Sequence, residues 1–88
     1  MKKTAKVKIK NALGLHARPA TIIAKLLQTS KSSVTFTHRK ETINARSIMS
    51  ILMLAASKNS QIMITVEGED AESTMKKLVE AFENQFGE

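Results

Sequence analysis

Apolar and polar residues alternate along three stretches of the chain, at residues 4–10, 34–38 and 62–66. A period of two places neighbouring side chains on opposite faces, so each stretch predicts a β-strand with one buried face. The polar face of the first stretch consists of lysines, which would also protect the edge of a sheet. A fourth, shorter strand is expected at residues 42–45, after a polar turn at residues 39–41.

Between the first two strands the apolar spacing changes to that of a helix, from Ala17 to about Thr29. Pro19 suits the first turn of a helix, where its missing N–H costs no hydrogen bond. The helix is therefore expected to begin near His16.

Two more helices are expected in the second half of the chain. The apolar run from Ile48 to Ala56 follows Ser47, which suits an N-cap, and Asn59 tolerates the left-handed conformation of a C-terminal cap. Asp70 is expected to be the N-cap of the last helix. The apolar stripe of that helix comprises Ala71, Met75, Leu78, Val79, Phe82 and Phe86.

The predicted order is strand, helix, strand, strand, helix, strand, helix, and no linker or repeat interrupts it. A single domain is therefore expected over residues 1–88. Because the strands have one polar face, the helices must all cover the other face. The predicted fold class is α/β (α+β), as a two-layer sandwich with an antiparallel sheet.

Charge is unevenly distributed along this basic chain, whose formal net charge is +6. Residues 1–66 contain twelve Lys or Arg and one acid, whereas residues 67–88 contain seven acids and two lysines. A basic surface suits nucleic acid, anionic lipid, phosphate groups or an acidic protein. A nucleic-acid-binding domain is therefore an alternative, although such domains usually interleave aromatic and basic residues, and Phe36 is the only aromatic in the basic part.

Composition also restricts the compartment and the cofactors. The absence of Cys excludes disulfides and thiolate metal sites. The two histidines lie on separate elements without nearby carboxylates, so no metal and no cofactor is expected. The longest apolar run, Ile51 to Ala56, is too short to cross a bilayer, and residues 1–3 are not followed by the apolar segment of a signal peptide. We therefore expect a cytoplasmic protein without direct membrane insertion.

One segment, Gly14 to Pro19, combines residues suited to binding an anion and transferring a phosphoryl group. It lies at the start of a predicted helix, whose free N–H groups carry partial positive charge. Arg18 would add a bidentate phosphate donor, and His16 a nucleophilic ring nitrogen near neutral pH. A surface or capping role for His16 and a solvated charge at Arg18 are the simpler alternatives. No phosphate-binding glycine loop, metalloprotease motif or nucleophile elbow is present, which removes most enzyme classes.

The segment Gly14-Leu15-His16-Ala17-Arg18-Pro19-Ala20-Thr21 resembles the active-site signature of the HPr family, the histidine-containing phosphocarriers of the bacterial phosphotransferase system. Residues 44–49 resemble the family's regulatory serine segment, and residues 68–70 the turn before its last helix. The resemblance covers essentially the whole chain. It implies an HPr-like open-faced sandwich, with strand order 1-4-2-3 and three helices on one face.

The resemblance also implies a function, that of a carrier rather than an enzyme. His16 would accept a phosphoryl group on Nδ1 from enzyme I, which phosphoenolpyruvate charges, and pass it to IIA domains of sugar permeases. Arg18 would stabilise the phosphate. The family is expected to be monomeric, and a carrier of the nitrogen-regulatory branch, which has the same site, is the nearest alternative.

A regulatory site and a docking patch follow from the same resemblance. Ser47 matches the serine that a dedicated serine kinase/phosphorylase modifies in many members, although it has a purely structural alternative as an N-cap. A phosphate there suits the helix dipole and would place negative charge beside a surface that docks acidic partners. Ile48, Met49 and Leu52 match the family's exposed apolar patch, for which core packing is the alternative, and Lys25 would add positive charge.

Three residues depart from the family pattern. Ser50 stands where a Gly usually lets a partner backbone approach, which affects recognition at Ser47. Leu13 replaces a small polar residue and so removes a side-chain cap. Asn59 replaces a Gly often found after the second helix, which is a mild change.

Overall fold

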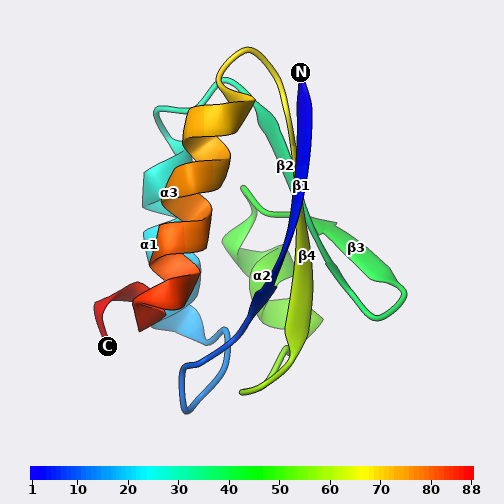
Figure 1. Ribbon diagram of the computed structural model, residues 1–88. Coiled ribbons are helices and arrows are strands. Elements are labelled where there is room, and N and C mark those ends of the chain that lie inside the picture. The colour runs from blue at the N-terminus through cyan, green and yellow to red at the C-terminus, as the bar shows by residue number, and fades with distance from the viewer.

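A four-stranded antiparallel sheet and three α-helices form the two layers of the protein, which a computed structural model describes over residues 1–88 (Figure 1). The strand order is β1-β4-β2-β3, as the family resemblance implied. In chain order the elements are β1 (Lys2–Lys8), α1 (Ala17–Leu27), β2 (Ser33–His38), β3 (Glu41–Asn44), α2 (Ile48–Leu54), β4 (Gln61–Glu67) and α3 (Ala71–Glu83). All four strands and all three helices predicted from the sequence are therefore confirmed.

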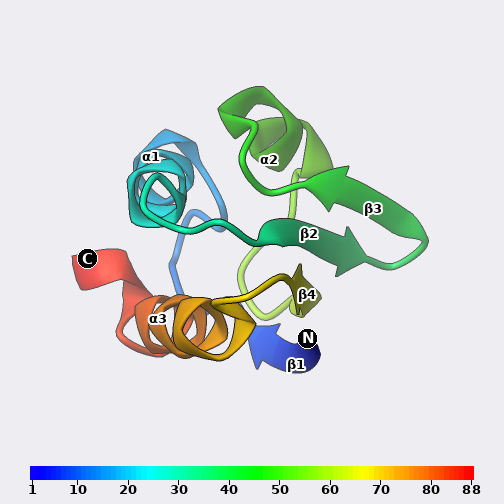
Figure 2. The same cartoon turned by 90° about the horizontal axis from the view of Figure 1, so that it is seen from above.

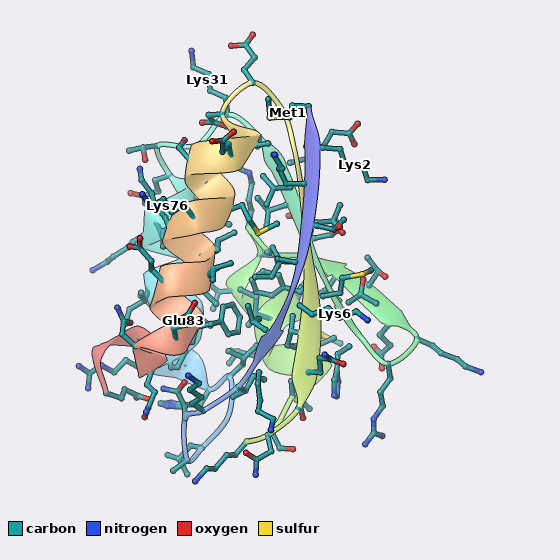
Figure 3. The ribbon with its side chains drawn as sticks, viewed as in Figure 1. Met1, Lys2, Lys6, Lys31, Lys76 and Glu83 are labelled. Atoms are coloured by element: carbon teal, nitrogen blue, oxygen red, sulfur yellow. The ribbon has the colours of Figure 1, made fainter.

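The helices lie on one face of the sheet and leave the other face uncovered (Figure 2). Strand register explains this arrangement, because Ile64 of β4 pairs with Ala5 of β1 and with Phe36 of β2. These side chains point toward the helices, and both Ile64 and Phe36 are fully buried. Lys6 points away from the helices, on the open face (Figure 3). The period-two pattern thus predicted correctly which face is buried.

Aromatic packing joins the helical layer to the sheet. The ring of Phe82 on α3 meets that of Phe36 on β2 edge to face, with centroids 5.7 Å apart. Its other neighbour is Phe86, at 4.9 Å. Edge-to-face geometry brings the positive ring edge onto the negative ring face and adds to the burial energy. The end of the chain is therefore anchored in the same core as the sheet.

The position of Phe86 corrects one expectation. It does not continue the apolar stripe of α3, because the helix ends at Glu83 and a 3₁₀ turn, η1 (Gln85–Gly87), follows. Gln85 and Phe86 both have positive φ angles, 58° and 53°. This left-handed turn reverses the chain and buries Phe86, which a continuing helix would have carried further along its axis.

The end of α2 corrects a second expectation. The helix stops at Leu54 rather than Ala56, and Ala55 takes the left-handed cap position with a φ of 52°. Asn59 also has a positive φ, 73°, but it serves a separate turn, in which its N–H donates to the carbonyl of Ile9. Through that turn Ile9 continues the backbone pairing just beyond the end of β1. At its other end, β1 begins at Lys2, two residues earlier than expected.

Asp70 stands at the N-cap position of α3, as expected, but its side chain does not cap the helix. The carboxylate accepts hydrogen bonds from the hydroxyls of Ser32 and Ser30 and from the N–H of Lys31, on the connection between α1 and β2. The bond from Ser32 is the main cause that lowers the pKa of Asp70 from 3.8 to about 2, with the Lys31 N–H next. Asp70 therefore ties two loops together instead of closing its own helix.

Arg46 holds the other side of the same connection. Its guanidinium donates to the carbonyls of Leu27, Ser30 and Ser32, at distances of 2.7–2.8 Å. The bond to Leu27 lies at the carbonyl end of α1, where cations are favoured, and the other two hold the connection to β2. They also fix the residue immediately before Ser47. None of the three α-helices has the length and hydropathy that a membrane span needs.

Candidate functional site

The loop between β1 and α1 packs directly on the chain that leaves α2. Gly14 has a φ of 68°, and a Cβ there would come within 2.9 Å of the Cα of Ser57 and closer still to the carbonyl of Ala56. The next residue, Leu15, donates its N–H to that same carbonyl at 3.0 Å and is itself buried. Gly14 is therefore required here both by backbone conformation and by contact, and Leu15 fixes the start of α1 in the core.

His16 is the N-cap of α1, so the helix begins where the sequence predicted. Its carbonyl accepts the N–H of Ala20 at 3.1 Å, while its ring makes no capping bond. The N–H groups of Ala17 and Arg18, at the first two positions, have no carbonyl partner within the helix. The ring, with about 30% of the side chain exposed, is thus accessible at a helix end that favours negative charge.

The carboxylate of Glu88, the last residue, meets the ring of His16. Glu88 Oε2 lies 3.0 Å from Nε2, and Oε1 lies 3.3 Å from it. Both views of the ribbon place the C-terminus beside the start of α1 (Figures 1 and 2). Because one ring nitrogen faces this carboxylate, Nδ1 is the nitrogen left for another partner.

Asn11 holds the C-terminal residues at this place. It is buried, and its Nδ2 donates to the carbonyl of Gln85 at 2.8 Å and to Oε1 of Glu88 at 2.5 Å. The hydrogen bond from Asn11 is the main cause that lowers the pKa of Glu88. The hydrogen bond and charge of His16 and the charge of Arg18 act in the same direction, while partial burial opposes them. Glu88 is therefore favoured as a carboxylate beside His16.

Arg18 follows His16 by two residues, in the first turn of α1, and its side chain is exposed. It forms no ion pair, although its positive charge helps to lower the pKa of Glu88. A guanidinium that is free of partners can turn toward a bound phosphate and donate two parallel hydrogen bonds. Its place next to His16 suits this role.

A second surface lies on α2, which packs against α1. Ser47 is its N-cap, and the Ser47 hydroxyl accepts the N–H of Ser50 at 3.1 Å, as the sequence predicted. Ser50 provides this bond through its backbone, so the change from Gly leaves the cap intact. The α2 surface patch consists of exposed apolar side chains at Ile48, Met49, Leu52 and Met53, which are exposed by 39%, 68%, 38% and 74%.

The structure thus leaves Ile48, Met49 and Leu52 at the surface instead of in the core. Sequence reasoning missed Met53, which is more exposed than any of them, and Leu13, exposed by 76% on the loop before His16. Lys25 is exposed but lies in the last turn of α1, at the far end of the helix from His16. His38 is the last residue of β2. No group of three or more His, Cys, Asp or Glu side chains is placed to hold a metal ion.

No sequence signal pointed directly to Asn11 and Glu88. A lone Asn after a strand and an acid at the end of a helix are both ordinary surface residues by pattern. The pattern places Phe86, two residues before Glu88, on the apolar stripe of the last helix. The return of the chain to His16 depends on the left-handed turn, which periodicity does not reveal.

Comparisons with known proteins agree with this geometry. A family model described as "PTS HPr component phosphorylation site" matches residues 3–84. A phosphocarrier protein HPr of Chlamydia muridarum is 48% identical over 80 residues, which cover 91% of this chain and 77% of that protein. The HPr of Xylella fastidiosa is 38% identical, with 91% and 90% of the two chains covered. A crystal structure of HPr from Thermoanaerobacter tengcongensis superposes with a TM-score of 0.93 at 36% identity, covering 98% of this chain and 97% of that one.

The open-faced sandwich and a histidine at the N-terminus of its first helix define a phosphocarrier, a protein that carries a phosphoryl group from one protein to another. The chain belongs to the HPr family and is a phosphocarrier of the phosphotransferase system. It works with other proteins of that system, as a carrier and not as an enzyme in its own right. The family assignment therefore favours this function over nucleic-acid binding.

Proposed function

We propose that His16 accepts the phosphoryl group of phosphorylated enzyme I at Nδ1 and donates it to IIA domains of sugar permeases. The observation that carries this proposal is the position of the His16 ring, partly exposed at the N-terminus of α1. Orphan N–H groups and Arg18 surround that position with positive charge. The phosphoryl oxygens, which bring negative charge, would be stabilised there.

In the proposed step, the Nδ1 lone pair forms a bond to phosphorus while the bond to the donor breaks. The electron pair of the broken bond leaves with the donor. The ring gains positive charge during this step, and the phosphate oxygens face the helix end and Arg18. The reverse step on an IIA domain uses the same groups, as a carrier requires.

The proposal is tested with purified enzyme I and labelled phosphoenolpyruvate. The expected product is one phosphate per chain that is stable in alkali and labile in acid, which distinguishes a phosphoramidate from a phosphate ester. His16→Ala should take up none, and His38→Ala, which removes the other histidine, should behave as the parent does. Label on the His16→Ala variant would contradict the assignment. Transfer onward to a sugar-specific IIA domain or to a nitrogen-regulatory one would distinguish the two branches.

We further propose that Ser47 is a regulatory phosphorylation site. A phosphate at this N-cap would meet the free N–H groups of α2, whose first residues include Ile48 and Met49 of the α2 surface patch. Its negative charge would then repel an acidic partner that docks on the patch. Incubation with ATP and extract of the source cells should give an acid-stable phosphate in the parent and in His16→Ala, but none in Ser47→Ala. An equal label in Ser47→Ala would contradict this site.

The α2 surface patch and Lys25 are proposed to dock the partner proteins. Exposed methionines suit such a surface because they adapt to different partners.

The protein is also proposed to act in the cytoplasm, as one monomeric domain. A monomer is what the family resemblance implies. Sedimentation equilibrium should give the mass of one chain, 9.7 kDa, and a mass of two chains would contradict the monomer.

A further inference from the structure

We propose that Glu88 is a positioning residue, which holds the ring proton of His16 on Nε2 and so leaves Nδ1 as the nucleophile. The Nε2 atom of His16 lies 3.0 and 3.3 Å from the two carboxylate oxygens of Glu88. An ionised carboxylate accepts hydrogen bonds and cannot donate them. A neutral ring in this position must therefore present Nε2–H, and its lone pair lies on Nδ1.

The C-terminal residues are held in place by contacts that do not involve His16. Asn11 uses both hydrogens of its amide, one on the carbonyl of Gln85 and one on Glu88. Phe86, between them in the chain, is 4% exposed and packs on Phe82. Glu88 therefore reaches the ring from an anchored turn and not from a free chain end, and its side chain is only 23% exposed.

This arrangement has a consequence for the transfer step. When Nδ1 forms its bond to phosphorus, Nε2 keeps its proton, so no proton has to leave the ring. The positive charge that develops on the ring lies next to the Glu88 carboxylate, which stabilises it. Glu88 should therefore affect the rate of transfer at saturation more than the docking of a partner.

The experiment compares four proteins: the parent, Glu88→Ala, Glu88→Gln and Glu83→Gln. Glu83 is an exposed acid at the end of α3, labelled in Figure 3, so it controls for the loss of one negative charge. Long-range proton–nitrogen NMR of ¹⁵N-labelled histidine, recorded at a pH where the rings are neutral, reports which ring nitrogen carries the proton. His38 is an internal control in every spectrum.

The parent and Glu83→Gln should show His16 as the Nε2–H tautomer. Glu88→Gln should keep it, because the amide oxygen still accepts a hydrogen bond, whereas Glu88→Ala should shift His16 toward a mixture and leave His38 unchanged. The maximal rate of phosphoryl uptake from enzyme I should fall about fivefold in Glu88→Ala, the upper range for a partly exposed charge pair, with KM unchanged. Glu88→Gln should lie between Glu88→Ala and the parent, because it keeps the tautomer and loses the charge.

If His16 of Glu88→Ala keeps the Nε2–H tautomer of the parent, the inference is wrong, whatever the uptake rates are. It is also wrong if Glu88→Ala changes only the KM for uptake from enzyme I and not the maximal rate. The inference rests on the proposed role of His16, but the two fail differently. If the parent takes up no phosphate on His16, the proposed function fails, while the spectra of the unphosphorylated proteins still decide whether Glu88 orients the ring.

Discussion

The backbone of Gly14 lies against the carbonyl of Ala56, so closely that a Cβ on Gly14 would overlap it. This contact seats the loop before α1 on the chain that leaves α2, and the following residue, Leu15, bonds to the same carbonyl. His16 therefore takes its position from a packing contact between two segments that are distant in sequence. The loop cannot adjust without moving the histidine.

Gly14→Ala should for this reason lower the free energy of unfolding by about 3 kcal/mol, since left-handed strain adds to the steric overlap. It should also slow phosphoryl uptake, because the start of α1 must shift. Denaturant unfolding and uptake from enzyme I measure the two effects. Gly87→Ala is the matched control: Gly87 has a similar φ of 77°, but a Cβ there would meet nothing within 4 Å. It should lose only the strain, about 1 kcal/mol; equal losses in the two variants would show that overlap with Ala56 is unimportant.

Asn11→Ala should release the C-terminal residues. Loss of its hydrogen bond, the main cause of the lowered pKa of Glu88, should let that pKa rise toward its ordinary value. Stability should fall by about 1–2 kcal/mol, because the carbonyl of Gln85 loses its partner. Carbon-detected NMR titration of the Glu88 carboxyl measures the pKa. Asn84→Ala, an exposed Asn on the same turn, should change neither quantity; an unchanged Glu88 pKa in Asn11→Ala would contradict the assigned contact.

The sequence predicted the elements well because their signals are local. Alternation and helical spacing reflect which side chains are buried, and burial repeats every few residues along a strand or helix. The His16 and Arg18 motif is also local, since both residues lie in one helix turn. The partner of His16 is not local, as Glu88 lies 72 residues away.

The same distinction explains the failures at the ends of helices. The preference of Asp for an N-cap predicted the position of Asp70 but not its contacts, because hydroxyls of Ser30 and Ser32 on another segment compete for the carboxylate. Phe86 left the helical pattern because its burial against Phe82 favours a left-handed turn, which short-range propensity disfavours. Ala55 takes a cap position that pattern assigned to Asn59, four residues later.

Asp70→Asn should destabilise the protein near neutral pH and much less in strong acid. The folded-state pKa of Asp70, about 2, lies below its ordinary value of 3.8, so the ionised carboxylate stabilises the fold above about pH 4. That contribution is lost as the pH falls from about 4 through 2, where the parent carboxyl is protonated too. At pH 7 the variant should melt roughly 5 °C lower than the parent, because hydrogen bonds to Ser32, Lys31 and Ser30 weaken.

Thermal unfolding at a series of pH values measures this difference. Glu69→Gln, the neighbouring exposed acid, is the matched control and should follow the parent at every pH. A melting difference between Asp70→Asn and the parent that stays constant from pH 7 to 2 would show that ionisation of Asp70 does not stabilise the fold.

Met49→Asp should weaken docking without weakening the fold. Met49 is 68% exposed at the second position of α2, where an acid suits the helix dipole, so the melting temperature should not fall. The variant loses an apolar contact and adds negative charge facing an acidic partner, so the KM for phosphoryl uptake from enzyme I should rise about tenfold with little change in the maximal rate.

Met63→Asp provides the comparison, because Met63 is a partly exposed Met on the opposite, open face of the sheet. Its KM should equal that of the parent, and a similar rise in both variants would mean that total charge, not the α2 surface patch, governs recognition.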